Sequence, residues 1–247
     1  MGADVAILHD RCVMMARSQP KEALERAKEW KDEGGGIAAD HCIAMAYFEL
    51  RDFKTAAVRF EELATKGMQM PVRARAQALD QAGQSWLDAE QPARAKADFD
   101  AAVTLIGNEP DLLIDRSEAL AALKQYWEAI DDLNKVIDVA PNRADAFIYR
   151  GSAYRSVDAP DLALEDVEHG LKLQPDNTLG LLERGNLRAQ KGDVAGARKD
   201  WSRVIQLSPK SPAAAAARAD LARVATGGEA KTGGPRKKKP PEPADEQ

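Results

Sequence analysis

A fixed interval of 34 residues recurs along this 247-residue chain and constrains its fold more than any other feature. The residues that repeat at this interval are Pro141, Pro175 and Pro209; Arg116, Arg150 and Arg184; Ala129, Ala163 and Ala197; and Asp98, Asp132, Asp166 and Asp200. Self-similarity at one period indicates a stacked array, in which each unit buries its apolar face against its neighbours. We therefore expect a repeat protein with a long concave surface.

The apolar pattern of each unit predicts a pair of helices. In residues 144–177, two apolar stripes recur at helical spacing, one formed by Phe147, Gly151 and Tyr154 and the other by Leu162, Leu164, Val167 and Leu171. A small residue at the eighth place of a unit lets the two helix backbones approach closely. We expect Asp161 and Asp193 to be helix N-caps. Because no segment alternates like a strand, we predict an all-α fold.

The unit resembles the tetratricopeptide repeat of bacterial proteins, with Gly151, Tyr154, Ala163 and Pro175 as its clearest motif residues. The resemblance implies a right-handed α-solenoid of six helix–turn–helix repeats over residues 4–225. The repeats are predicted at 4–36, 37–75, 76–109, 110–143, 144–177 and 178–211, followed by a capping helix at 212–225. Residues 226–247, rich in Gly, Pro and Lys, are predicted to be a disordered tail.

Composition excludes several classes of partner. The formal net charge of −5 argues against nucleic acid as the main partner, because phosphate binding needs clustered Lys and Arg. A basic run at 236–239 is interpreted as part of the solvated tail, with an anionic-surface patch as the alternative. No apolar run approaches the ~20 residues that span a bilayer, and no secretory leader is recognised.

No catalytic motif is found. After the glycine run at 34–36, a phosphate-binding loop would require Lys and Ser or Thr, and Ile37 follows instead. We interpret the run as a turn with one left-handed glycine. The histidines, His9, His41 and His169, lie in no recognisable nucleophile motif. We expect no enzyme activity, no cofactor and no metal.

The repeated Arg and Asp residues are predicted to be structural. Arg116 and Asp132, Arg150 and Asp166, and Arg184 and Asp200 are each 16 residues apart, one on the first and one on the second helix of a unit. Antiparallel helices bring such positions face to face, which favours an ion pair within each unit. The alternative is a charged row that grips a polymer.

The resemblance places Cys12 and Cys42 near each other, on adjacent first helices that face the groove. A disulfide, two free buried thiols, or a metal bound together with His9 and His41 are the alternatives. The adjacent His41 and Cys42 point about 100° apart on a helix, which is poor for chelation. A disulfide would need an oxidising compartment. Likeness to bacterial envelope proteins of this class favours the periplasm, with the cytoplasm as the alternative.

The resemblance also implies that the second, fifth, ninth and twelfth places of each unit line a groove. The candidate partner-binding residues are Leu8, Met15, His41, Met45, Phe48, Gln77, Asp80, Gln84, Asp111, Glu118, Asp145, Ser152, Arg155 and Asn186. Ile114 and Ile148 occupy fifth places where binders of chaperone tails need other residues, so that subfamily is excluded. A groove that is apolar at its amino-terminal end and acidic in its middle is suited to binding an amphipathic or basic peptide segment.

These observations predict a non-catalytic scaffold or adaptor that binds a peptide or partner protein, without nucleic acid and without a membrane span. Two other hypotheses remain. One is an accessory regulatory subunit of an enzyme or secretion complex, and the other is a self-assembling homo-oligomeric scaffold.

Overall fold

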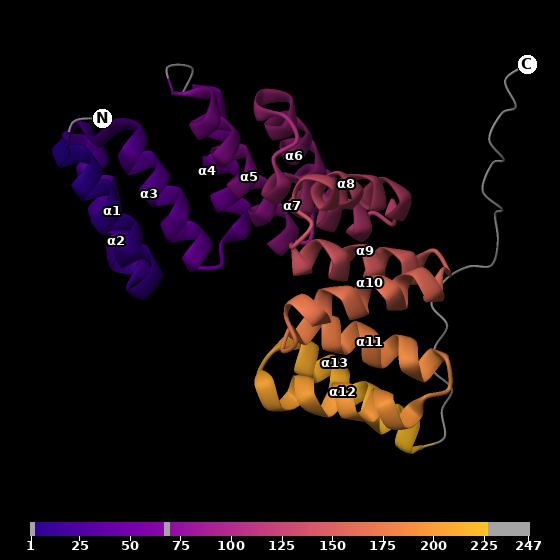
Figure 1. Ribbon diagram of the computed structural model, residues 1–247. Coiled ribbons are helices and arrows are strands. Elements are labelled where there is room, and N and C mark those ends of the chain that lie inside the picture. Colours follow the sequence, from indigo (N-terminus) through magenta and orange to yellow (C-terminus); the bar gives the residue numbers. More distant parts are fainter. Residues whose placement is uncertain (1–2, 67–69, 227–247) are drawn as a thin grey trace, which may run out of the picture. The chain divides into compact units, whose positions relative to one another are not determined.

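The computed structural model describes residues 3–66 and 70–226, and helices dominate that part of the chain (Figure 1). The helices are α1 (Ala3–Ser18), α2 (Pro20–Trp30), α3 (Gly36–Glu49), α4 (Phe53–Lys66), α5 (Val72–Asp88), α6 (Pro92–Ile106), α7 (Pro110–Ala122), α8 (Tyr126–Val139), α9 (Ala144–Ser156), α10 (Pro160–Leu173), α11 (Thr178–Gln190), α12 (Val194–Leu207) and α13 (Pro212–Ala225). No strand occurs in the described residues, and the predicted all-α fold is confirmed. The predicted tail lies outside these residues except for Thr226.

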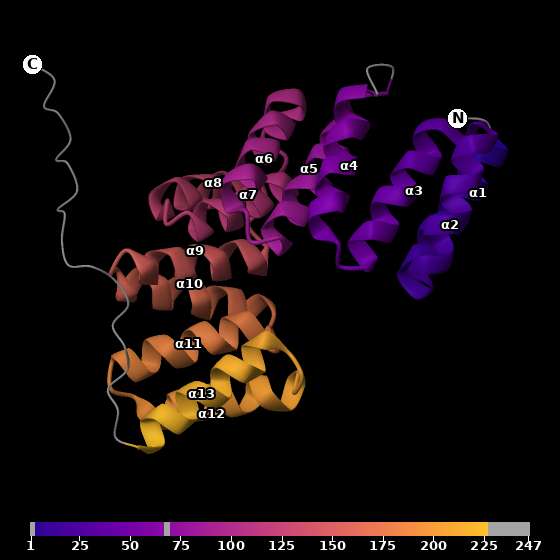
Figure 2. The same cartoon turned by 180° about the vertical axis from the view of Figure 1, so that it is seen from behind.

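The helices belong to two compact units, Met1–Tyr149 and Arg150–Gln247, whose boundary falls within α9. In the first unit each helix from α1 to α7 packs against the next one along the chain (Figure 1). In the second unit α10 packs on α11, α11 on α12 and α12 on α13, as the reverse view in Figure 2 also shows. Pairwise packing of consecutive helices is the arrangement that a helical repeat requires.

Local signals define the helix ends. The Asp193 side chain accepts a hydrogen bond from the Gly196 amide at 2.9 Å, as predicted for an N-cap. The prediction for Asp161 is wrong, because Pro160 occupies the first position of α10 and Asp161 lies inside its first turn. The glycine run forms the turn before α3, where Gly34 has a φ of 95°.

The eighth place of a repeat is small because the paired helices touch there. A methyl group built on Gly83 would come within 2.6 Å of the Phe99 ring, and one on Gly185 within 2.5 Å of Trp201 Nε1. Both aromatic rings are fully buried. Glycine at these two places therefore gives the ring of the second helix its space, as the sequence predicted.

The core is a series of local clusters. One cluster surrounds Phe60 of α4, the next contains Trp86 and Phe99, and a cluster in the second unit surrounds Trp201. Each is built mainly by helices that follow one another in the chain, which is the expected arrangement for a stacked array.

Candidate functional site

A ladder of side-chain contacts connects the first helices of successive repeats in the first unit. In each rung, the ninth place of one repeat contacts the sixth place of the next. The rungs are Cys12–Cys42, Met45–Gln81, Gln84–Asp115 and Glu118–Tyr149. We call these four contacts the ladder. They bring three of the predicted groove residues, Met45, Gln84 and Glu118, into a single row of neighbouring groups.

The first rung of the ladder is a disulfide. Cys12 and Cys42 are bonded, with their Cα atoms 6.0 Å apart, within the range that a disulfide can span. Of the three alternatives for these cysteines, the structure has the disulfide. It joins α1 to α3, and Cys42 is completely buried in the cluster that both helices share.

Two histidines lie beside this disulfide. His9 Nε2 is 2.9 Å from His41 Nδ1, and His41 Nε2 is 3.0 Å from the Gln81 side-chain oxygen. Burial lowers the pKa of His41, which favours its neutral form. Within residues 3–66 and 70–226, no cluster of three or more metal-ligating side chains occurs.

The next part of the ladder is acidic. The Gln84 amide donates hydrogen bonds to Asp80 Oδ2 at 3.3 Å and to Asp115 Oδ2 at 3.0 Å. Asp80 Oδ1 is buried and has no hydrogen-bond partner among the described residues. Burial, reinforced by the nearby Asp115 carboxyl, raises the pKa of Asp80 to about 7, and burial also raises the pKa of Asp115. Two half-buried carboxyl groups thus face each other across α5 and α7.

The acidic row continues along α7. Burial raises the pKa of Glu118, although the Tyr149 hydroxyl donates a hydrogen bond to this carboxylate. Arg143 draws Asp111 and Asp145 together, donating to Asp111 at 2.6 Å and to Asp145 at 2.7 and 3.0 Å. Asp111 and Asp145, two of the predicted groove residues, are therefore paired with an arginine at the edge of the row.

The apolar groove residues are mostly packed into the fold. Leu8 is 46% exposed, whereas Met15 and Met45 pack against the buried cluster around Cys42. Phe48 contacts Phe53 edge to face, with the ring centroids 5.4 Å apart. Gln77 is exposed at the start of α5. Leu8 thus offers the most accessible apolar surface of the predicted set.

In the second unit, the predicted groove residues make contacts within the fold. Arg155 donates to Glu183 at 2.6 Å, and Asn186 accepts a hydrogen bond from Trp201 Nε1 at 3.1 Å. The Ser152 carbonyl accepts a hydrogen bond from the Ser156 hydroxyl at 3.0 Å. Their role in binding stays a prediction.

The repeated arginines bind the repeated aspartates at two points each. The donor–acceptor distances are 2.7 and 2.7 Å for Arg116–Asp132, 2.7 and 2.7 Å for Arg150–Asp166, and 3.0 and 2.7 Å for Arg184–Asp200. The aspartate side chains are at most 8% exposed. These pairs join the two helices of a repeat, as a structural role requires.

Sequence reasoning missed the partners at the sixth place of the third to sixth repeats. Gln81, Asp115 and Tyr149 complete the ladder, and in the second unit Glu183 at the same place binds Arg155. The signal was present, because these four residues are spaced at 34 and all are polar. Apart from Cys42, the groove positions taken from the family resemblance did not include the sixth place.

No family model matches the chain. DnaJ homolog subfamily C member 3 of Rattus norvegicus is 25% identical over 96 residues, which are 39% of this chain and 19% of that protein. The TPR repeat-containing thioredoxin TDX of Arabidopsis thaliana is 29% identical over 95 residues, 38% of this chain and 25% of that protein. The match thus spans a quarter or less of these relatives.

Several solved structures share the fold. A thermophilic TPR protein of Thermus thermophilus has a TM-score of 0.62 at 17% identity, over 77% of this chain and all of that one. MamA of Desulfovibrio magneticus has a TM-score of 0.59 at 20% identity, over 71% of this chain and 97% of that one. YrrB, described as a TPR protein with an unusual peptide-binding site, has a TM-score of 0.53 at 18% identity, over 78% and 96%.

Tetratricopeptide-repeat domains generally bind proteins and are typically non-catalytic. No catalytic domain is evident in the part of the chain that the structure describes, and no helix there is long and apolar enough to cross a membrane. The pairwise helix packing and the structural neighbours together show that this chain has the tetratricopeptide-repeat fold.

Proposed function

We propose that the protein is a non-catalytic scaffold or adaptor that binds a basic or amphipathic peptide segment of a partner protein along the ladder. The observation that carries the proposal is the group of half-buried carboxyls Asp80, Asp115 and Glu118, whose pKa values are all raised. Burial is the largest cause for all three, and the negative charge of a neighbouring acid adds to it in each case. A cation supplied by a partner would stabilise their ionised forms.

The local cations do not supply this charge. Within the described residues, the nearest basic group that acts on Asp115 is Arg143, which is already bound to Asp111 and Asp145. Gln84 offers the acidic pair hydrogen bonds but no positive charge. A Lys or Arg side chain would give Asp80 Oδ1 the partner that it lacks.

The amino-terminal end of the ladder supports an amphipathic segment. Leu8 is well exposed, and His41 and Gln81 continue the row of polar groups between α3 and α5. A segment with basic residues on one side and apolar residues on the other would match both parts. The fold itself is compatible with this mode, since tetratricopeptide-repeat domains generally bind proteins.

Fluorescence anisotropy tests the proposal with two labelled peptides of equal length, one built of Leu and Lys and the other of Leu and Glu. We expect the Lys peptide to bind, and to bind more weakly in higher salt. Its affinity should rise as the pH increases from about 6 to about 8, because Asp80 ionises over that range. Equal binding of the two peptides would contradict the proposal.

A double variant, Asp80→Asn with Asp115→Asn, locates the binding site. It should lose most of the affinity for the Lys peptide and most of the pH dependence. The matched control is Asp131→Asn, which removes an exposed carboxyl from α8. If the control variant and the double variant lose affinity equally, the charge acts only through the overall field of the protein.

The disulfide supports a further proposal, that the protein matures in an oxidising compartment, the periplasm if the host is bacterial. Thiol counting under denaturing, non-reducing conditions, on protein isolated from its natural host, tests it. We expect no free thiol, and two free thiols would place maturation in a reducing compartment.

A further inference from the structure

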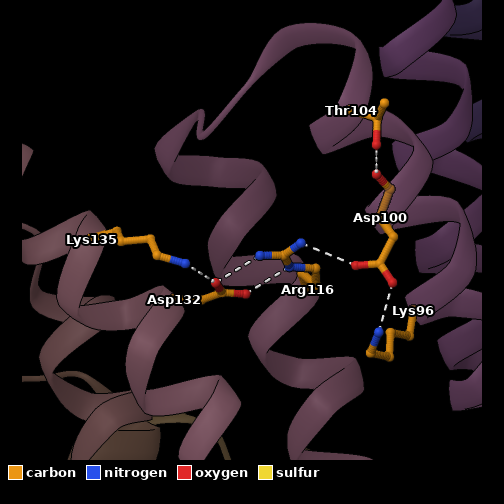
Figure 3. Close-up of polar contacts among 6 residues, drawn as sticks. All are labelled: Lys96, Asp100, Thr104, Arg116, Asp132 and Lys135. Carbon is orange, nitrogen blue, oxygen red and sulfur yellow. Dashed lines mark hydrogen bonds and ion pairs between the residues drawn. The ribbon is translucent and has the colours of Figure 1, made fainter.

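Arg116 lies in a clamp formed by two carboxylates. It donates to Asp132 of its own repeat at 2.7 Å through two nitrogens and to Asp100 of the preceding repeat at 3.0 Å (Figure 3). Asp132 and Asp100 are further bound by Lys135 and Lys96. We use the name arginine clamp for these three places: the seventh and twenty-third of one repeat and the twenty-fifth of the repeat before it.

The third repeat has the two acids of the clamp and lacks the arginine. Counted from its start at residue 76, the seventh place is Ala82 and the twenty-third is Asp98, and Glu61 is the twenty-fifth place of the second repeat. Ala82 is completely buried in the cluster around Phe60. The guanidinium that would neutralise both carboxyls is therefore missing, and no side chain of Ala82 can replace it.

Glu61 accepts hydrogen bonds from two other side chains. Trp86 Nε1 donates to it at 2.7 Å and Arg94 at 3.4 Å, while the Arg94 guanidinium lies 3.5 Å from the centre of the Trp86 ring. Asp98 has no such substitute, since its Oδ2 atom is buried without a hydrogen-bond partner among the described residues. Of the two acids in the third repeat's clamp, Asp98 is the one left unsatisfied.

Two charged side chains of the described residues act on Asp98. Among the described residues, Glu61 of α4 and Arg94 of α6 are the charged groups that act on it, while Arg116 of α7 is engaged with Asp100 and Asp132. On α5, the clamp position is the uncharged Ala82. Burial first, and then the Glu61 charge, raise the pKa of Asp98 from 3.8 to about 7, and Arg94 opposes this only in part.

We propose that a proton occupies the third repeat's arginine clamp: it neutralises the buried Asp98 carboxyl, and its loss on ionisation loosens the packing of α5 between α4 and α6. The proton takes over the role that a guanidinium has in the later repeats. The third repeat thereby becomes a pH-sensitive joint in the array.

Loosening of α5 would also affect the ladder, because this helix contributes residues to both the clamp and the ladder. This helix carries Ala82 toward the clamp, and it carries Asp80, Gln81 and Gln84 in the ladder. Because the pKa of Asp98 is higher in the folded than in the unfolded chain, its contribution to stability is complete below about pH 4 and is lost as the pH rises through about 7. This inference does not depend on the proposed peptide binding.

Carboxyl ¹³C NMR titration of the full-length protein tests the proposal directly, with the Asp98 signal assigned by its loss in Asp98→Asn. Asp80 is assigned in the same way, since its pKa is also about 7. We expect Asp98 to be half-titrated near pH 7. Half-titration near the ordinary value of 3.8 would overturn the proposal.

Restoring the arginine provides the second test. In Ala82→Arg the Asp98 signal should titrate below its ordinary pKa, as expected for an acid beside a guanidinium. If crowding at this buried position prevents the Ala82→Arg variant from folding, the Asp98→Asn variant alone tests the proposal. Its urea midpoint should exceed that of the unmodified protein at about pH 8 and vary less with pH, whereas Asp131→Asn should behave like the unmodified protein. Equal pH dependence in all three proteins would overturn the proposal.

Discussion

Residues 110–211 and residues 4–109 are held together by different interactions. Each of the three later repeats carries a buried two-point ion pair, Arg116–Asp132, Arg150–Asp166 or Arg184–Asp200. In the three earlier repeats the arginine position holds Asp10, Ile43 or Ala82. There, a disulfide and an indole–carboxylate contact take its place. The stabilising contact that several repeats share thus lies at positions that follow the 34-residue period. Contacts that occur in one place only lie where a repeat departs from it.

The difference also separates two kinds of polar group. In the later repeats each buried aspartate accepts hydrogen bonds on both carboxylate oxygens and joins the two helices of its pair. In the earlier ones, Asp80 and Asp98 each have one buried oxygen without a partner. Unsatisfied buried groups are costly, which makes Asp80 and Asp98 candidates for binding a partner or a proton.

The largest effect is expected from the disulfide. Replacing Cys12 and Cys42 by serine should lower the free energy of unfolding of the first two repeats by roughly 3–4 kcal/mol, from the entropy of a loop of 30 residues. Urea unfolding followed by the fluorescence of Trp30 on α2 measures it, with the reduced protein as a second readout. An unchanged midpoint in both would mean that helix packing alone holds α1 in place.

The next effect concerns the ion pairs of the later repeats. Arg116→Ala should cost about 3 kcal/mol, because it leaves Asp132, whose side chain is 3% exposed, without its main partner. Arg73→Ala, which breaks an exposed pair with Glu109, is the control and should cost less than about 1 kcal/mol. Equal losses would show that burial does not distinguish these pairs.

A smaller effect is expected where the third repeat departs from the pattern. Trp86→Phe keeps most of the buried ring and removes the donor to Glu61, which should cost about 1–2 kcal/mol. Chemical denaturation at neutral pH measures the change. Trp127→Phe, on the exposed face of α8, should be nearly neutral, and a similar loss in both variants would remove the special role of the indole contact.

The smallest effect tests a turn that the third to sixth repeats share. Glu90, Lys124 and Asp158 have positive φ angles, and the equivalent residue one repeat on is Gly192, with a φ of 89°. Lys124→Gly should therefore raise the midpoint of thermal unfolding slightly, by a gain of about 0.5–1 kcal/mol. Glu128→Gly, inside the first turn of α8, should lower it. A loss in Lys124→Gly would show that its side chain matters more than its backbone.

The sequence predicted the fold well because its signals are local or periodic. Gly83 and Gly185 indicated where helices touch, and the 16-residue spacing of Arg116 and Asp132 indicated an ion pair across two antiparallel helices. The N-cap prediction failed at Asp161, where Pro160 takes the first helical position instead. The site was predicted only in part, since Cys12 and Cys42 were expected to be neighbours but the sixth-place partners of the other three rungs were missed.

By itself, the sequence determined the period, the helix pairs and the positions of the repeated charges, since side chains spaced at a helical interval share a face wherever the chain folds. Only the tertiary structure decided that Cys12 and Cys42 are bonded, that Gln84 meets Asp115, and that Asp98 Oδ2 has no donor among the described residues. Such contacts depend on how neighbouring helices pack. The raised pKa values depend in addition on burial, which exists only once the repeats are stacked.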